Sequence, residues 1–239
     1  MASGPGIVID IAAKRFAGMD QPLLQDLRLA IAPSGIVALV GPSGVGKSTM
    51  LRMLAGLDRD FAGTITLDGI SAQDAAPPGF VFQDPRLLPW LSAIDNLLAV
   101  DPAMSEGVAQ AALARVGLGD AGGLFPHQLS GGMQRRVALA RALSVNARLL
   151  LLDEPFVSLD RTLVSEMQQI FIELVAATRP TVVFVTHLAD DAVRLADRVI
   201  VLDGRPATIV ADVALPVPAA QRDAGILATY RAKLDAANS

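Results

Sequence analysis

The sequence predicts an α/β fold, in which helices flank a mainly parallel sheet, and two observations predict it. Short apolar runs rich in Val and Ile alternate with segments of helical periodicity, the arrangement expected of strands joined by crossover helices. Hydrophobic residues make up 52% of the 239-residue chain and charged residues 18%, a balance that favours a large core and excludes a disordered chain. This length suits one large α/β domain or two small ones.

The expected strands are the short apolar runs, and the expected helices are the periodic segments between them. We predict strands over residues 6–11, 24–31, 36–41, 64–67, 79–82, 149–153, 181–185, 199–202 and 207–211. We predict helices over residues 47–55, 94–99, 108–116, 131–143, 163–177 and 190–195, and an amphipathic helix over 222–237. None of the apolar runs approaches the roughly 18 residues needed to cross a bilayer.

Residues 85–145 carry helical patterning and no convincing strand, although the rest of the chain is rich in strands. We therefore expect a helical insertion or subdomain there, inside a single domain that covers residues 1–216. We expect residues 217–239 to form a short tail whose helix follows the prolines Pro216 and Pro218. This tail is too short for an added regulatory domain.

The charge and the cysteine content argue against several classes of function. A net charge of −4 and an isoelectric point near 5.1 disfavour non-specific nucleic-acid binding, which needs a positive field. Because the sequence contains no cysteine, it can form neither disulfides nor thiolate metal sites. The first six residues lack the basic and apolar regions of a signal peptide, so we expect a cytosolic chain.

A glycine-rich segment matches the pattern G-x-x-x-x-G-K-[ST] directly after an apolar strand and directly before a helical run. Its residues are Gly41, Pro42, Ser43, Gly44, Val45, Gly46, Lys47, Ser48 and Thr49. Glycines let successive backbone N–H groups point inward at phosphate oxygens, and the following helix adds its positive end. Lys47 would reach the β- and γ-phosphates, and the Ser48 hydroxyl would ligate Mg²⁺. The segment predicts a nucleotide site; the alternative is a chance glycine-rich turn.

Two acidic residues, Asp153 and Glu154, follow a run of four leucines. A fully buried strand delivers them to the edge of a parallel sheet where α/β proteins bind ligands. Asp153 would hold the hydration shell of Mg²⁺, and Glu154 would polarise the attacking water as general base. Alone, such a pair is more often a solvated strand end or a helix cap, but the phosphate loop upstream reverses that preference.

A second anion-binding end is expected within residues 129–143, where Ser130, Gly131 and Gly132 open a helix. Exposed N–H groups and a hydroxyl at a helix N-terminus bind anions. Because the phosphate loop already cradles the nucleotide, a second anion site is most useful when it acts on the nucleotide of another copy. The segment therefore predicts a head-to-tail dimer.

On these motifs the chain resembles the ATP-binding subunits of ABC transporters, whose signature reads L-S-G-G-Q, over residues 6–212. The resemblance implies a P-loop NTPase core with an antiparallel β subdomain and a helical ABC subdomain at about 85–145. Gln83 looks like the glutamine that touches Mg²⁺ and follows the membrane partner. His187 looks like the switch histidine that contacts the γ-phosphate, and Asp160 like the aspartate that crosses the dimer interface in trans.

Other interpretations of single residues stay open. Alone, Gln83 would be a surface turn residue, and His187 a satisfied structural histidine. Family members stack adenine on an aromatic residue about two dozen positions before the phosphate loop, and Phe16 is the aromatic residue available there. The competing interpretation of Phe16 is a core phenylalanine.

The signature segment departs from the family pattern. Met133 stands at its fifth position and Gln134 follows one place later, which puts a polar contact from that fifth side chain in doubt. Arg135, Arg136 and Arg141 on the same segment are interpreted as a solvated helix face. Since the phosphate loop, the base, the signature serine and the histidine are all present, we do not expect an inactive relic.

The resemblance implies a Mg²⁺-dependent ATPase in which two copies of the chain enclose two ATP molecules and drive transmembrane permease subunits. A free-standing subunit resembles an importer component, which implies an indirect partner in a solute-binding protein and a peripheral place on the cytoplasmic face of the inner membrane. Residues 86–92 and 192–202 are similar to the nitrate/sulfonate/taurine importer group, and thiamine-precursor importers share some of this. Trp90 either meets the permease or anchors the helical subdomain.

Two other functions stay open, namely an ATPase for lipid export or extraction and a soluble ABC ATPase that acts on nucleic acid. The second has less support, because such relatives carry long coiled-coil or zinc-binding insertions or two cassettes per chain. Residues 83–143 hold neither cysteine nor heptads, and we expect no nucleic-acid partner. The transported solute is not encoded in this subunit.

Overall fold

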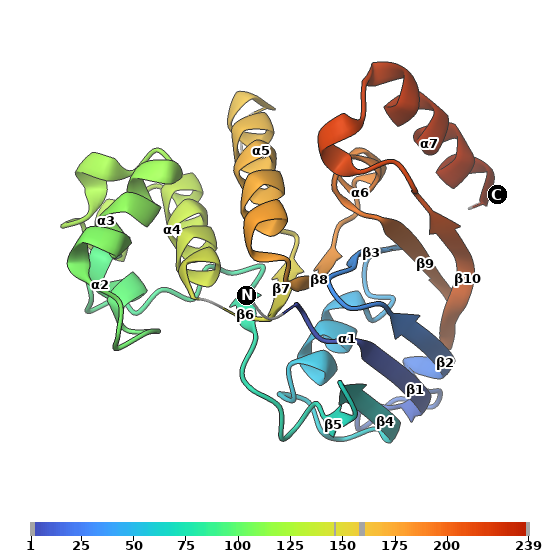
Figure 1. Ribbon diagram of the computed structural model, residues 1–239. Coiled ribbons are helices and arrows are strands. Elements are labelled where there is room, and N and C mark those ends of the chain that lie inside the picture. Colours follow the sequence, from blue (N-terminus) through green and yellow to red (C-terminus); the bar gives the residue numbers. More distant parts are fainter. Residues whose placement is uncertain (1–2, 146, 158–160, 238–239) are drawn as a thin grey trace.

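In the computed structural model, which describes residues 3–145, 147–157 and 161–237, the strands of the described residues form one ten-stranded sheet (Figure 1). The strands run in the order β5-β4-β1-β2-β10-β9-β3-β8-β7-β6. Their bounds are β1 (Ile7–Lys14), β2 (Leu24–Ile31), β3 (Ile36–Val40), β4 (Ala62–Leu67), β5 (Ile70–Ser71), β6 (Gly79–Val81), β7 (Leu149–Asp153), β8 (Thr181–Val185), β9 (Arg198–Gly204) and β10 (Ala207–Ala214).

Helices flank this sheet, which confirms the predicted α/β fold. Their bounds are α1 (Lys47–Leu54), α2 (Ala93–Leu98), α3 (Glu106–Arg115), α4 (Gly131–Ser144), α5 (Arg161–Thr178), α6 (Ala189–Leu195) and α7 (Ala224–Ala237). Among the described helices, none combines the length and the apolar character that crossing a membrane requires.

The sheet has a parallel half and an antiparallel half. In the described chain, β9, β3, β8, β7 and β6 run parallel to one another, and the phosphate loop and the acidic pair follow two of these strands. The strands β2, β1, β4 and β5 pair antiparallel. The two halves join where Ala207 of β10 pairs with Leu24 of β2.

The parallel strands are buried on both faces, because helices cover each side. Successive side chains of a strand point to opposite faces, and β7 shows the result. Leu149 and Leu151 belong to the apolar cluster that also contains α1, β1 and β2. Leu150 and Leu152 belong to the cluster that contains residues of α2 to α7. The four leucines therefore pack into two apolar clusters, one on each face of the sheet, and this packing positions the end of β7.

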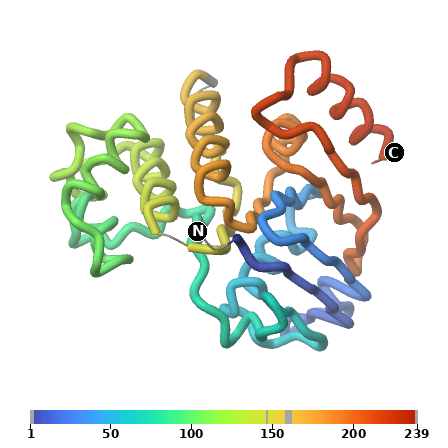
Figure 2. The backbone as a smooth tube through the Cα atoms, in the orientation of Figure 1, coloured from blue at the N-terminus to red at the C-terminus, as the bar shows by residue number. Residues whose placement is uncertain are grey.

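Helices alone connect β6 to β7 in the described part of the chain, namely α2, α3 and α4 with short 3₁₀ turns. In Figure 2 this green stretch projects to one side of α5, and the red C-terminal helix lies on the other. The division of the chain into a domain and a tail stays a prediction from the sequence, with bounds at 1–216 and 217–239. The bounds of the helical subdomain, 85–145, are likewise a prediction.

Element ends differ from the sequence prediction where side chains cap the backbone. Helix α7 begins at Ala224, not at residue 222, because the Asp223 carboxylate accepts the N–H of Ile226 at 2.8 Å. Arg222 instead turns inward and donates to the carbonyl oxygens of Val217 and Val193 at 2.7 and 2.8 Å. The two-residue strand β5 is not predicted by the sequence, because a run so short has no periodicity to detect.

Candidate functional site

The phosphate-loop residues lie between β3 and α1 in a conformation that requires glycine. Gly41, Gly44 and Gly46 have φ values of 153°, 79° and 112°, which residues with a side chain rarely adopt. A Cβ at Gly41 would also collide with the carbonyl oxygen of Leu202. No side chain caps the N-terminus of α1 at Gly46. Its first-turn N–H groups thus remain suited to an anion.

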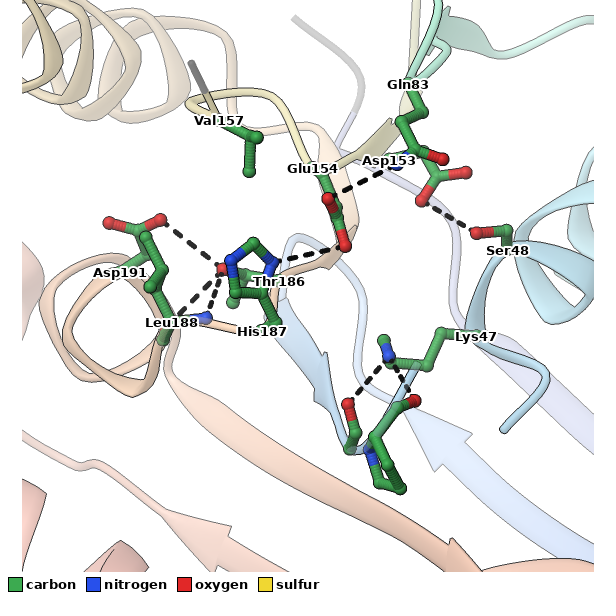
Figure 3. A network of polar contacts seen from close by, with 12 residues as sticks. Lys47, Ser48, Gln83, Asp153, Glu154, Val157, Thr186, His187, Leu188 and Asp191 are labelled. Atoms are coloured by element: carbon green, nitrogen blue, oxygen red, sulfur yellow. Dashed lines mark hydrogen bonds and ion pairs between the residues drawn. The ribbon is translucent and has the colours of Figure 1, made fainter. Parts of the chain in front are cut away.

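Lys47 and Ser48 reach in different directions from the first turn of α1 (Figure 3). The Lys47 Nζ donates to the carbonyl oxygens of Gly41 and Pro42 at 2.7 and 2.8 Å. Burial lowers the pKa of this ammonium group, although Glu154 and Asp153 act to raise it. The carbonyl oxygens of the phosphate loop therefore bind the Lys47 ammonium group and keep it beside the N-terminus of α1.

The acidic pair stands at the end of β7, beside the phosphate loop. Asp153 Oδ1 accepts a hydrogen bond from the Ser48 Oγ at 2.9 Å. Burial raises the pKa of the Asp153 carboxyl, and the bond from Ser48 counteracts it. Glu154 follows Asp153 in the chain, but its side chain is directed away from Ser48, because its backbone φ is 51°.

Glu154 brings together two residues from other elements (Figure 3). Its Oε1 lies 3.3 Å from the Nδ1 of His187, which follows β8. Its Oε2 lies 3.5 Å from the Nε2 of Gln83, which follows β6. The Glu154 N–H donates to the carbonyl oxygen of Val185 at 3.0 Å, which joins its backbone to the end of β8. The carboxylate thus lies between the side chains of His187 and Gln83.

One cavity of about 700 Å³ unites most of the residues predicted for the site. Its lining residues are Phe16, Met19, Leu23, Ser43, Gly44, Gly46, Lys47, Ser48, Thr49, Gln83, Glu154 and His187. Val45 is a phosphate-loop residue that does not line it, because its side chain is buried in the core beside Gly41. Met19 and Leu23 were not predicted from the sequence; their position in the loop that follows Phe16 is the signal that could have found them.

Phe16 is not a core residue. Its side chain is 39% exposed and lines the cavity, so the core interpretation is wrong. The buried Lys14 supports the ring, since its Nζ lies 4.6 Å from the ring centroid. This ammonium group is itself paired with Asp58 Oδ1 at 2.8 Å.

Ser130, Gly131 and Gly132 stand apart from this cavity, at the N-terminus of α4. The Ser130 Oγ accepts the N–H of Met133 at 3.2 Å and so caps the helix. The Met133 side chain packs against the apolar core. Asp160, predicted to act in trans, lies outside the described residues.

Comparison with known proteins decides the family. The sequence profile described as "ABC transporter" matches residues 24–157. The chain belongs to the ABC transporter family. It is an ATP-binding subunit of that family, and it hydrolyses ATP.

The relatives of this ABC ATPase include curated proteins and solved structures. The Xanthomonas axonopodis protein named "Aliphatic sulfonates import ATP-binding protein SsuB 1" is 45% identical over 90% of this chain and 88% of its own. A Pseudomonas aeruginosa protein of the same name is 41% identical over 88% of each chain. A dimeric ATP-binding cassette in a post-hydrolysis state with ADP and Pi has a TM-score of 0.79 at 31% identity, over 87% of this chain and 98% of that chain.

The arginines of α4 in this ABC ATPase are not a solvated face, which corrects the sequence interpretation. Arg135 Nη1 donates to the carbonyl oxygen of Val157, just beyond Glu154, at 2.9 Å. Arg136 Nη1 donates to the carbonyl oxygen of Val116 at 3.1 Å. Arg141 is half-buried, and this burial lowers the pKa of its guanidinium. Helical periodicity could not reveal these bonds, because their acceptors are backbone carbonyls of distant segments.

Proposed function

We propose that this ABC ATPase is the energy-supplying subunit of an importer, in which two copies enclose two Mg-ATP between the phosphate loop of one and the signature segment of the other. One observation carries the proposal. The cavity gathers Lys47, Gln83, Glu154 and His187 from separate elements, whereas the anion-binding end at Ser130 stands outside it. A second chain completes the site by bringing its signature segment to the nucleotide.

The residues beside the phosphate loop fit a magnesium ion. Mg²⁺ prefers oxygen ligands and retains several waters. The Ser48 hydroxyl and an Asp153 carboxylate oxygen lie 2.9 Å apart. Gln83, which lines the cavity together with Ser48, offers an amide. When bound, the ion neutralises phosphate charge.

In this arrangement the side chains divide the work of hydrolysis. Lys47 exchanges the carbonyl oxygens of Gly41 and Pro42 for phosphate oxygens, and the N–H groups of α1 hold the remaining charge. Glu154 accepts a proton from the attacking water and orients it. His187 and Gln83 fix the two carboxylate oxygens of Glu154 from either side. Most of the rate enhancement comes from positioning and charge stabilisation.

The segment that follows Gln83 is suited to meet the permease. Trp90 is 69% exposed, which rules out a buried anchor within the described chain. Arg141 holds this segment to α4 by donating to the carbonyl oxygens of Pro85 and Arg86 at 3.1 and 3.2 Å. An exposed aromatic residue on a segment tied to the core is typical of an interface. The subunit would then be peripheral on the cytoplasmic face of the inner membrane.

The solute class follows from the relatives. The eight curated proteins compared are between 40% and 47% identical to this chain and are named for aliphatic sulfonate import. We therefore propose an aliphatic sulfonate as the solute, delivered to the permease by a solute-binding protein. The names of these relatives favour an importer subunit over an ATPase for lipid export and over a soluble ATPase that acts on nucleic acid.

Copurification tests the proposal. The tagged chain is extracted from membranes in mild detergent, and its partners are identified by mass spectrometry. A multispanning permease is expected, and deletion of the subunit should abolish uptake of an aliphatic sulfonate but not of sulfate. Purification of the chain without a membrane protein, or together with nucleic acid, would contradict the proposed importer function.

A further inference from the structure

Three buried polar side chains meet behind His187, each from a different part of the fold. Asp191 of α6, Gln168 of α5 and Thr186, which follows β8, are 6%, 4% and 2% exposed. The Gln168 Nε2 donates to Asp191 Oδ1 at 2.9 Å. The Thr186 Oγ1 lies 3.4 Å from Asp191 Oδ2. Buried polar groups that satisfy one another hold their elements in a specific arrangement.

This cluster contacts the turn that carries His187 through the Thr186 side chain (Figure 3). The Thr186 Oγ1 accepts the N–H of Leu188 at 3.0 Å, so the residues on both sides of His187 are tied together. The His187 ring then meets Glu154 at 3.3 Å on the opposite side of the turn from Asp191. The Thr186 hydroxyl has two acceptors at 3.4 Å, Asp191 Oδ2 and the carbonyl oxygen of Leu188. When it donates to Asp191, it joins α6 to the turn that carries His187.

The burial of the Asp191 carboxylate is energetically costly, so its presence calls for a function. Taking the charged group out of water is unfavourable, and burial raises the pKa of Asp191 despite the bonds from Thr186 and Gln168. Asp191 does not line the nucleotide cavity. Apolar side chains would join α5 to α6 at lower cost, but they would not accept hydrogen bonds from two directions.

We propose that Asp191, held by Gln168, is a positioning residue that sets the Thr186–Leu188 turn so that the His187 ring stands against Glu154. The proposal rests on the proposed roles of Glu154 and His187 in ATP hydrolysis. It assigns a function to a helix-to-helix contact that lies wholly outside the nucleotide cavity.

Imidazole NMR measures the proposed effect without any reference to activity. The chain has two histidines, so ¹⁵N spectra of the rings contain His187 and, as an internal control, His127. In the full chain, Asp191→Ala should shift the ring signals of His187 and leave those of His127 unchanged. Asp190→Ala is the matched control, because it removes the neighbouring carboxylate, which is exposed and pairs with Arg231 of α7.

Hydrolysis supplies the second readout. Asp191→Ala should lower kcat about tenfold and change the Kd for ATP by less than about twofold, since the cavity is intact. Asp191→Asn, which accepts one of the two bonds, should fall between this variant and the wild type. Added to His187→Ala, the Asp191→Ala change should cost little more, because it acts through that histidine.

Other outcomes overturn the proposal. Unmoved His187 signals in a folded Asp191→Ala chain, or fully additive losses in the double variant, would show that the cluster only joins α5 to α6. If Asp191→Ala fails to fold, Gln168→Leu tests the same cluster from the other helix. If His187→Ala alone keeps normal turnover, the role proposed for His187 in hydrolysis fails, and the NMR shift still decides whether Asp191 positions the ring.

Discussion

At the scale of single residues, Glu154 combines a strained backbone with a carboxylate that contacts two other elements. Its φ of 51° lies in the left-handed region, which costs a residue with a side chain roughly 1–2 kcal/mol. This turn directs the carboxylate out of the line of β7 and between Gln83 and His187. Asp153, one residue earlier, instead stays on Ser48. The positive φ thus gives two adjacent carboxylates different partners.

Glu154→Gln should slow ATP turnover by roughly 10²–10⁴ and leave ATP binding nearly unchanged, because the amide keeps the shape and loses the basic oxygen. Steady-state hydrolysis and equilibrium nucleotide binding measure the two effects. Glu106→Gln, an exposed position in the first turn of α3, is the matched control. Near-normal turnover of Glu154→Gln would show that another group is the base.

Phe16→Ala should weaken ATP binding about tenfold, as expected for loss of one base stack, and should not weaken binding of inorganic tripolyphosphate. Calorimetry on both ligands measures the difference. Phe125→Ala removes a phenylalanine of equal exposure, 39%, away from the cavity and should change neither affinity. Equal weakening of both ligands would mean that Phe16 supports the loop and does not bind the base.

At the scale of elements, the segment between β6 and α2 is held by side chains and not by secondary structure. Asn96 of α2 is fully buried. It accepts the N–H of Leu88 at 2.8 Å and donates to the carbonyl oxygens of Leu88, Leu91 and Ser92 at 3.2, 3.1 and 3.0 Å. This anchors the segment that presents Trp90.

Asn96→Ala should lower the free energy of unfolding by about 2–4 kcal/mol, because it leaves several buried backbone groups without a partner. Chemical denaturation measures this loss. Gln73→Ala removes an exposed amide and should stay within about 0.5 kcal/mol of the wild type. A similar small effect for Asn96→Ala would show that water replaces these bonds.

The elements also show what the sequence could and could not predict. The strands Leu24–Ile31, Leu149–Asp153 and Thr181–Val185 match the prediction to the residue, because apolar runs buried on one or both faces are visible locally. The acidic pair was predicted from the leucine run before it, and the phosphate loop from its glycine and lysine spacing. The anchor Arg135 was not predicted, since the tertiary fold brings its partner, the carbonyl oxygen of Val157, near it. Asn96 was not predicted either, because the irregular segment whose backbone it binds has no periodicity.

At the scale of the whole molecule, the phosphate loop and the signature segment lie apart in the single chain, and we propose that they are two halves of a nucleotide site. The cavity holds the phosphate loop, and the signature segment stands apart at the N-terminus of α4. A Cβ at Gly131 would meet nothing within 4 Å, so the N-terminus of α4 is open in the single chain. A solved relative at 31% identity is a dimer with ADP and Pi. Both observations support a site completed by a second copy.

Gly131→Asp should leave the fold of the single chain intact, because the position is open and an acid in the first turn of a helix is favourable. It should abolish the ATP-bound dimer, because the new charge would face the phosphates of the partner's nucleotide. Circular dichroism checks the fold, and ATP hydrolysis by the variant should fall to background. Normal hydrolysis would contradict a role in trans.

Sedimentation of the Glu154→Gln chain with and without Mg-ATP tests the central claim most directly. The account predicts a monomer without nucleotide, a dimer with Mg-ATP, and a monomer under both conditions once Gly131→Asp is added. A chain that binds Mg-ATP and remains a monomer, or a Gly131→Asp variant that dimerises as readily, would contradict it.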